Sequence, residues 1–192
     1  FGVDAASIIA IFGSAGVAIG LALQGSLSNL AGGVLILILK PFKVGDYIIE
    51  DANKNEGTVS EIQIFYTKLT TPDNKTIILP NGTLANSSLT NVTHAPLRRN
   101  EIKIGISYDS DIKKAKKVLM DLLNQDVDVL QDEEKIVFVD ELADSSVVIG
   151  VRCFFKHEDY WTGRWRLMEE AKYALEANGI VIPYPQMDVH IQ

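Results

Sequence analysis

The first forty residues carry an unbroken run of uncharged, mostly apolar side chains, from Ala5 to Leu39 between Asp4 and Lys40. The run is longer than the roughly 20 residues that a helix needs to cross a bilayer core of about 30 Å. As a straight helix it would measure about 52 Å. We therefore expect a break in the helix at Gln24 and Gly25, where polar and flexible residues separate two apolar halves.

One face of this predicted helix holds small side chains and only two bulky ones, Val17 and Leu21, when residues are placed at about 100° per step. The face consists of Ala10, Gly13, Ser14, Val17, Gly20, Leu21 and Gln24. Its two flanks are formed by Gly13, Gly16 and Gly20 and by Ser14 and Ala18. Small residues at this spacing let helix backbones approach closely in lipid. The helix is either a dimerising membrane anchor or one of a ring of helices around a pore. In a pore, Val17 and Leu21 would form two apolar rings that block ions by dewetting.

After Pro41, which should end the helix, the pattern becomes one of short strands. The predicted strands are Tyr47–Ile49, Thr58–Ile64, Tyr66–Thr71 and Thr76–Leu79. Turn residues separate them, and Pro80-Asn81-Gly82 is the last predicted turn. The β-like pattern runs from Val44 to about Val92 and predicts a small five-stranded β-domain or half-barrel, whose edges an oligomer would cover.

From Asn100 the pattern alternates between strands and helices. The predicted strands are Glu101–Ser107, Ile136–Val139, Val147–Phe155 and Ile180–Ile182. One helix is predicted after an N-cap at Asp109-Ser110-Asp111, and a second from about Thr162 to Ala177. The order βαββαβ is that of a ferredoxin-like α/β domain. Pro183 and Pro185 set apart a last strand, Met187–Ile191.

Charge and cysteine content restrict the possible functions. The net charge is −7, and the acidic excess lies after residue 100, which argues against nucleic acid as a partner. Cys153 is the only cysteine, so the chain cannot form an internal disulfide. Lys40 and Lys43 follow the apolar run, which places the C-terminal side in the cytoplasm. The first residue, Phe1, already lies in the apolar region, so we expect a fragment of a longer membrane protein.

No pattern of catalytic or metal-binding residues emerges. His94, His157 and His190 lie far apart in the sequence, and together with Cys153 they form no metal-binding pattern. Asp109 and Asp111 fit helix capping better than acid–base chemistry. We therefore predict that the chain is not an enzyme and needs no cofactor or metal. Trp161 and Trp165 are interpreted as core or interface aromatics.

Several motifs resemble the small-conductance mechanosensitive channel (MscS) family. They are the stretches Gly20–Gly33, Pro41–Asp46, Pro80–Gly82, Arg98–Glu101, Tyr108–Asp111 and Pro183–Val189. The resemblance covers essentially the whole chain in order. It implies a homoheptameric channel with residues 1–40 as the kinked pore-lining transmembrane helix and 41–97 as an Sm-like β-domain. Residues 98–182 would form the ferredoxin-like α/β domain, and 183–192 a strand in an intersubunit parallel β-barrel.

The resemblance also implies functions for single residues. Val17 and Leu21 align with the two gate-ring leucines of the family, so the first ring departs from Leu to Val. The family's helix break aligns with Gln24 and Gly25, and a second flexible site with Gly33. The packing flanks of the pore helix would be Ala10, Gly13, Ser14, Gly16, Ala18 and Gly20. The pair of tension-sensing helices that precedes the pore helix in the family is not part of this sequence.

These observations predict a tension-gated channel in the inner membrane of a prokaryote, releasing ions and small osmolytes on hypo-osmotic shock. Its partners would be its own copies, the lipid bilayer and the permeating solutes. Two alternatives are a membrane-anchored, Sm-like ring that captures RNA and a ligand sensor built on the α/β domain. The lack of interleaved basic and aromatic residues counts against the first. Recording from stretched membrane patches separates all three.

Overall fold

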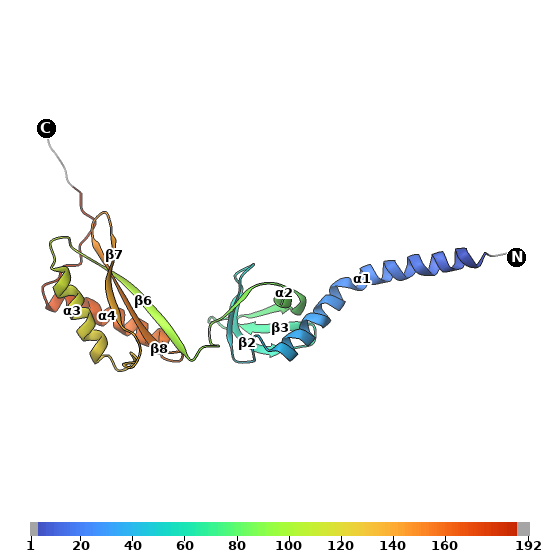
Figure 1. The fold of residues 1–192 in the computed structure, drawn as a ribbon, viewed down its shortest axis with the longest axis horizontal. Helices are drawn as coiled ribbons and strands as arrows, with labels where there is room; N and C mark the ends of the chain where they lie inside the picture. The colour runs from blue at the N-terminus through green and yellow to red at the C-terminus, as the bar shows by residue number, and fades with distance from the viewer. Residues whose placement is uncertain (1–3, 188–192) are drawn as a thin grey trace, which may run out of the picture. The chain divides into compact units, whose positions relative to one another are not determined.

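The computed structural model describes residues 4–187, which fold as two compact units, one up to His94 and one from Ala95. The first unit contains α1 (Ala5–Leu39), β1 (Tyr47–Glu50), β2 (Glu56–Ile62), β3 (Tyr66–Thr70), β4 (Thr76–Pro80), α2 (Asn81–Asn86) and β5 (Leu89–Asn91). The second contains β6 (Leu97–Ile106), α3 (Ile112–Gln125), β7 (Ile136–Leu142), β8 (Val147–Lys156) and α4 (Tyr160–Ala177). Each unit is described by itself (Figure 1).

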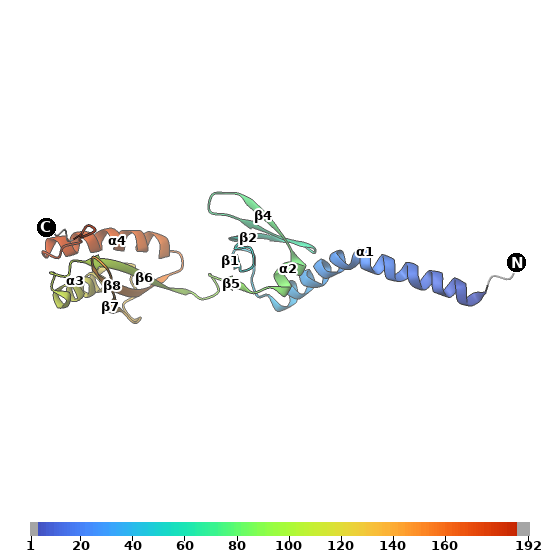
Figure 2. The same ribbon diagram turned by 90° about the horizontal axis from the view of Figure 1, so that it is seen from above.

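The apolar run forms one continuous helix, α1, capped at its start by the Asp4 carboxylate, which accepts a hydrogen bond from the Ala6 N–H. It ends at Leu39 and is followed by Lys40, whose left-handed backbone conformation precedes Pro41. The predicted break at Gln24 and Gly25 is therefore wrong. The chain has no proline before Pro41, so every backbone donor within the helix remains available. The ribbon of α1 nevertheless changes direction along its length, so the helix is bent but not broken (Figures 1 and 2).

The β-domain is a five-stranded antiparallel sheet in the order β4-β3-β2-β1-β5. Its small core includes Ile36, near the end of α1, and Phe42, just after it. They pack with Ile48, Val59, Leu69, Leu79 and Leu84. The sequence predicted a turn at residues 80–82, but Asn81 and Gly82 begin the short helix α2 instead. The C-terminal end of α1 is thus part of the β-domain core.

The second unit is a three-stranded antiparallel sheet in the order β6-β8-β7, with α3 and α4 packed on it and on each other (Figure 2). The Asp111 carboxylate caps α3, as predicted, by accepting hydrogen bonds from the Lys113 and Lys114 N–H groups. The predicted strand Ile180–Ile182 is wrong, because this segment makes only one backbone bond to β6's end, from the Ser107 N–H to the Val181 carbonyl. Most of the predicted strand Met187–Ile191 lies outside the described residues.

Candidate functional site

The N-terminal part of α1, residues 5–27, which we call its upper part, is exposed along its whole length in the part of the chain that the structure describes. Val17 and Leu21, the predicted gate residues, are 64% and 67% exposed. A Cβ added at Gly13, Gly16, Gly20 or Gly25 would meet nothing within 4 Å among the described residues. The other residues predicted to pack or bend the pore helix, Ala10, Ser14, Ala18 and Gln24, are exposed too. Helix α1 is long and apolar enough to cross a membrane. A single chain therefore leaves this whole surface to be covered by lipid or by other copies.

The C-terminal part of α1, residues 28–39, which we call its lower part, is instead docked tightly against the β-domain. A Cβ added at Gly33 would lie 2.1 Å from the Ile64 carbonyl oxygen, and one at Gly32 would lie 2.5 Å from the Asn81 carbonyl oxygen. Contacts this short with backbone atoms leave room only for glycine. Gly33, predicted to be a flexible site, is buried and closely packed, which argues against a hinge there.

Hydrogen bonds fix the same contact. The side-chain oxygen of Asn29 accepts a hydrogen bond of 2.9 Å from the Gly82 N–H, at the start of α2. A Cβ at Gly82 would lie 2.7 Å from the Ser28 hydroxyl oxygen, so this glycine also permits the close approach. We call the contact formed by Asn29, Gly32 and Gly33 of α1 with Ile64, Asn81 and Gly82 the helix joint.

Asn81 holds the β-domain side of the helix joint and is fully buried. Its side-chain N–H donates to the Gln63 carbonyl at 2.8 Å, and its side-chain oxygen accepts from the Thr67 hydroxyl at 2.8 Å. Its backbone N–H donates to the Phe65 carbonyl at 2.9 Å. Because all of these groups are paired, the buried amide fixes the turn between β2 and β3 against α2. Sequence reasoning missed this role. Two sequence features could have indicated this close contact: the adjacent pair Gly32-Gly33 within a helix, and the Asn-Gly pair at residues 81 and 82.

The open face of the α/β sheet carries a ladder of ion pairs. Arg152 bonds to Glu101 at 2.6 Å and Lys103 to Asp140 at 2.7 Å. The hydrogen bond from Arg152 holds the pKa of the Glu101 carboxyl below its ordinary value, and Asp140 raises the pKa of Lys103. The two pairs set opposite charges side by side on this face, so the charges neutralise one another. Among residues 4–187, no cluster of three or more His, Cys, Asp or Glu could hold a metal ion.

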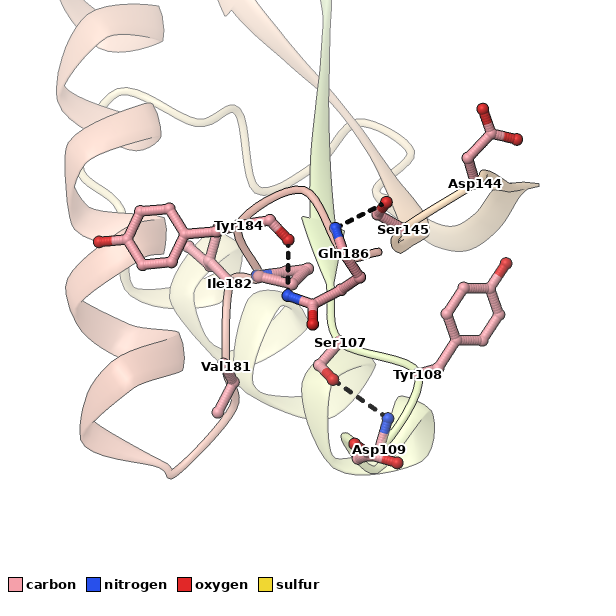
Figure 3. Close-up of a pocket in the computed structure, with 10 residues that line it drawn as sticks. Ser107, Tyr108, Asp109, Asp144, Ser145, Val181, Ile182, Tyr184 and Gln186 are labelled. Carbon is pink, nitrogen blue, oxygen red and sulfur yellow. Dashed lines mark hydrogen bonds between the residues drawn. The ribbon is translucent and has the colours of Figure 1, made fainter. Parts of the chain in front are cut away.

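A cavity of about 320 Å³ lies between the loop after β6 and the segment that follows α4 (Figure 3). The Ser145 hydroxyl accepts a hydrogen bond from the Gln186 N–H, and the Asp109 N–H donates to the Ser107 hydroxyl. The carboxylate of Asp144 points away from the other lining residues (Figure 3). The cavity thus offers no convergent charged groups, and its hydrogen bonds serve to hold the chain after α4 in place.

Two family models match most of the chain. One, described as the β-domain of a mechanosensitive ion channel, matches residues 25–94. The other, described as the C-terminal part of the mechanosensitive ion channel MscS, matches residues 100–182.

Curated relatives and a solved structure agree with these matches. An uncharacterized MscS family protein of Buchnera aphidicola is 47% identical over 100% of this chain and 67% of its own length. The small-conductance mechanosensitive channel of Edwardsiella ictaluri is 46% identical over 93% of this chain and 62% of its own length. The crystal structure of Helicobacter pylori MscS in its closed state superimposes with a TM-score of 0.93 at 35% identity, covering 100% of this chain and 75% of that one. The chain thus spans about two thirds of the length of these curated relatives.

Proposed function

The chain belongs to the MscS family of mechanosensitive ion channels, and from this premise we propose that it lines the pore and builds the vestibule of a tension-gated homoheptamer. The channel would release ions and small osmolytes on hypo-osmotic shock. The family is one of membrane channels and not of enzymes. The observation that carries the proposal is the contrast along α1. Its upper part is apolar and uncovered, whereas its lower part is locked to a soluble domain.

The gate in this proposal consists of two rings of apolar side chains, from Val17 and Leu21. Narrow apolar constrictions exclude water and thereby ions, without any plug. A gate without charge cannot sort ions by sign, so selectivity would arise in the acidic vestibule. The small flanks at Gly13, Gly16, Gly20, Ser14 and Ala18 would let neighbouring helices pack closely and slide. Membrane tension would then shift the population toward whichever state occupies more membrane area.

The helix joint supplies the fixed end for this motion. Because α1 is anchored from Asn29 onward, a tilt of the upper part has to be absorbed above that residue. Gln24 and Gly25 are the proposed hinge. They lie between the gate and the anchor, and a Cβ added at Gly25 would meet nothing within 4 Å, so no packed side chain opposes bending there. A continuous but bent helix is compatible with this function, since a hinge needs a soft position and not an interruption.

The remaining parts of the proposal follow from charge and chain order. Lys40 and Lys43 just after α1 favour a cytoplasmic location for the soluble domains. The membrane would be the inner membrane of a prokaryote. Residues 1–40 would form the pore helix, 41–97 and 98–182 the vestibule wall, and 183–192 the strand that closes its floor. Partners would be the lipid bilayer, the permeating solutes and the other copies, and no cofactor is proposed. The likeness to a closed-state structure supports a closed conformation.

Electrical recording tests this function directly. The intact protein is expressed in cells that lack their own mechanosensitive channels, and excised patches are stretched by suction. We expect discrete currents whose open probability rises steeply with tension. Patches that contain the protein, verified by labelling, but carry no tension-dependent current would refute the proposal.

A further inference from the structure

Two stretches of the first unit that lie far apart in the sequence run side by side just beyond the end of α1. One is the exit of α1, Pro41–Tyr47, and the other is the end of β5 with the residues that lead to the second unit, Asn91–His94. The Val92 N–H donates a hydrogen bond of 2.9 Å to the Tyr47 carbonyl. The Tyr47 N–H in turn donates to the Thr93 hydroxyl at 2.9 Å. The chain that enters the β-domain from the membrane helix therefore lies against the chain that leaves it.

The side chain of Asn91 bonds to both stretches at once. Its nitrogen donates to the Pro41 carbonyl at 3.2 Å and to the Asp46 carboxylate at 2.9 Å. Its oxygen accepts from the backbone N–H groups of Thr93 and His94, at 3.1 Å and 3.0 Å. We call Pro41, Asp46, Asn91, Thr93 and His94 the exit clip. One planar amide thus ties the residues just after α1 to the residues just before the second unit.

Asp46 is placed for this contact by the turn that follows Pro41. Its carboxylate also accepts a hydrogen bond of 2.9 Å from the Lys43 N–H, and its own N–H donates to the Lys43 carbonyl at 3.1 Å. Burial raises the pKa of the Asp46 carboxyl, but the hydrogen bonds from Asn91 and Lys43 outweigh it, so the pKa lies below its ordinary value. The ionised form is favoured, and a hydrogen bond to an ionised acceptor is stronger than one between neutral groups.

Apart from the exit clip, a short strand pair connects the two stretches. β5 pairs with β1 over three residue pairs, from Ile48 with Asn91 to Glu50 with Leu89. In the sheet that residues 4–187 form, β5 is an edge strand. A short edge strand with few hydrogen bonds opens locally at a low cost in free energy. Without the clip, a displacement of the β-domain would therefore be absorbed by opening of β5 before it reached the second unit.

We propose that Asn91 is a positioning residue for gating, which keeps the connection to the second unit rigid so that this unit follows displacements of α1 and the β-domain. The helix joint and the exit clip then have different functions. The helix joint fixes α1 to the β-domain, whereas the exit clip passes the movement of this assembly along the chain. The inference rests on the proposed function, because it needs a pore helix that moves under tension.

Paired substitutions test the exit clip without removing all of its bonds. Asn91→Asp keeps a side-chain oxygen for the Thr93 and His94 N–H groups but loses the donor to Pro41 and Asp46. The new carboxylate also lies against that of Asp46, and the two repel each other. Adding Asp46→Asn restores a donor and an acceptor between the two positions, with the partners exchanged. We expect Asn91→Asp to loosen the clip and the double variant to restore it.

The measurement follows the second unit while the channel opens. Lys117, on α3, is exposed, whereas Cys153 is fully buried, so Lys117→Cys takes a spin label selectively. Pulsed electron paramagnetic resonance gives the distances between labels on different copies in lipid vesicles, before and after a lysophospholipid imposes lateral tension. With the native clip, we expect these distances to shift on opening. The shift should be largely lost in Asn91→Asp, although tension-gated current persists, and should return in the double variant.

A matched control makes the same chemical change away from the clip. Asn124, on α3, is exposed, and its side chain has no hydrogen-bond partner among residues 4–187, so Asn124→Asp should leave the shift unchanged. An equal shift in Asn91→Asp and the parent, or no shift in a parent that carries tension-gated current, would overturn the coupling alone. If Asn91→Asp loses its current, recovery in the double variant supports the clip and no recovery overturns it. A parent without tension-gated current would overturn the proposed function itself.

Discussion

Replacing glycine by alanine at two positions of α1 should have opposite effects, because only one of the two glycines contacts the β-domain. Alanine is favoured over glycine inside a helix by about 1 kcal/mol. Gly25→Ala should gain that amount, since the new methyl group meets nothing within 4 Å in the chain. Gly33→Ala gains the same propensity, but its methyl carbon would lie 2.1 Å from the Ile64 carbonyl oxygen and 2.7 Å from the Asn81 side-chain nitrogen.

The loss of stability caused by Gly33→Ala depends on which atoms would have to move to make room for the methyl group. Neither contact at Gly33 is with a side chain that can move aside easily, because Ile64 contributes backbone and the buried Asn81 amide is held by hydrogen bonds at both its nitrogen and its oxygen. Overpacking of this kind costs about 1–3 kcal/mol, and the strain falls on the helix joint. Set against the gain of about 1 kcal/mol in helix propensity, this cost leaves a net loss of up to about 2 kcal/mol. For a chain of this size, the melting temperature should therefore fall by up to about 8 °C. Separation of α1 from the β-domain should also change the opening tension.

The assay compares both variants with the parent by thermal unfolding in one detergent and by patch recording. Gly33→Ala should melt below the parent, while Gly25→Ala should melt at or above it and stiffen the hinge, altering closure after opening. If Gly33→Ala is as stable as Gly25→Ala, the close contact with Ile64 does not exist and the anchored-helix mechanism fails with it.

Three further predictions concern single residues. Leu21→Ser should keep the constriction hydrated and lower the opening tension, and an unchanged threshold in patch recordings would remove Leu21 from the gate. Asn29→Ala should lose the hydrogen bond to the Gly82 N–H and destabilise the helix joint by about 1 kcal/mol; equal hydrogen exchange of α2 in the variant and the parent would contradict this. Burial raises the pKa of the Cys153 thiol to about 11. The folded protein should therefore resist thiol reagents at pH 8, and stability should fall as the pH rises from about 9 through 11, because the unfolded thiol ionises first. Rapid labelling of the native protein at pH 8 would show that the thiol is accessible.

The sequence predicted those features that depend on local pattern. The charge-free run marked the membrane helix, Pro41 marked its end, and the Asp111 cap marked the start of α3. Predictions failed where chain geometry depends on distant contacts. Nothing near residue 81 indicates that Asn81 is paired with Gln63 and Thr67, so an expected turn proved to be a helix. Similarly, the apolar residues Ile180–Ile182 resemble a strand but lack a partner strand for most of their backbone groups.

The candidate site shows the same contrast between features that depend on local pattern and features that depend on distant contacts. Helical periodicity placed Val17 and Leu21 on one face together with the small residues, and the structure leaves all of them exposed. The mistaken break at Gln24 and Gly25 came from helix length and flexibility, which make a bend easy but do not remove a hydrogen bond. Gly33 was assigned flexibility because of its residue type, but the residue that faces it, Ile64, is 31 positions away and carries no sequence signal of contact.

The helix joint has a consequence for how the protein is made. Its residues all belong to one chain, and 53 positions separate Asn29 from Gly82. During synthesis the membrane helix therefore leaves the ribosome before the surface that receives it, and its lower end must wait for α2. Once residue 82 has emerged, the joint can close within a single copy, whereas the glycines of the upper helix find no neighbour until other copies arrive. Biogenesis would then proceed in two stages, with each newly made subunit already holding its soluble domain against its membrane helix when it meets the others.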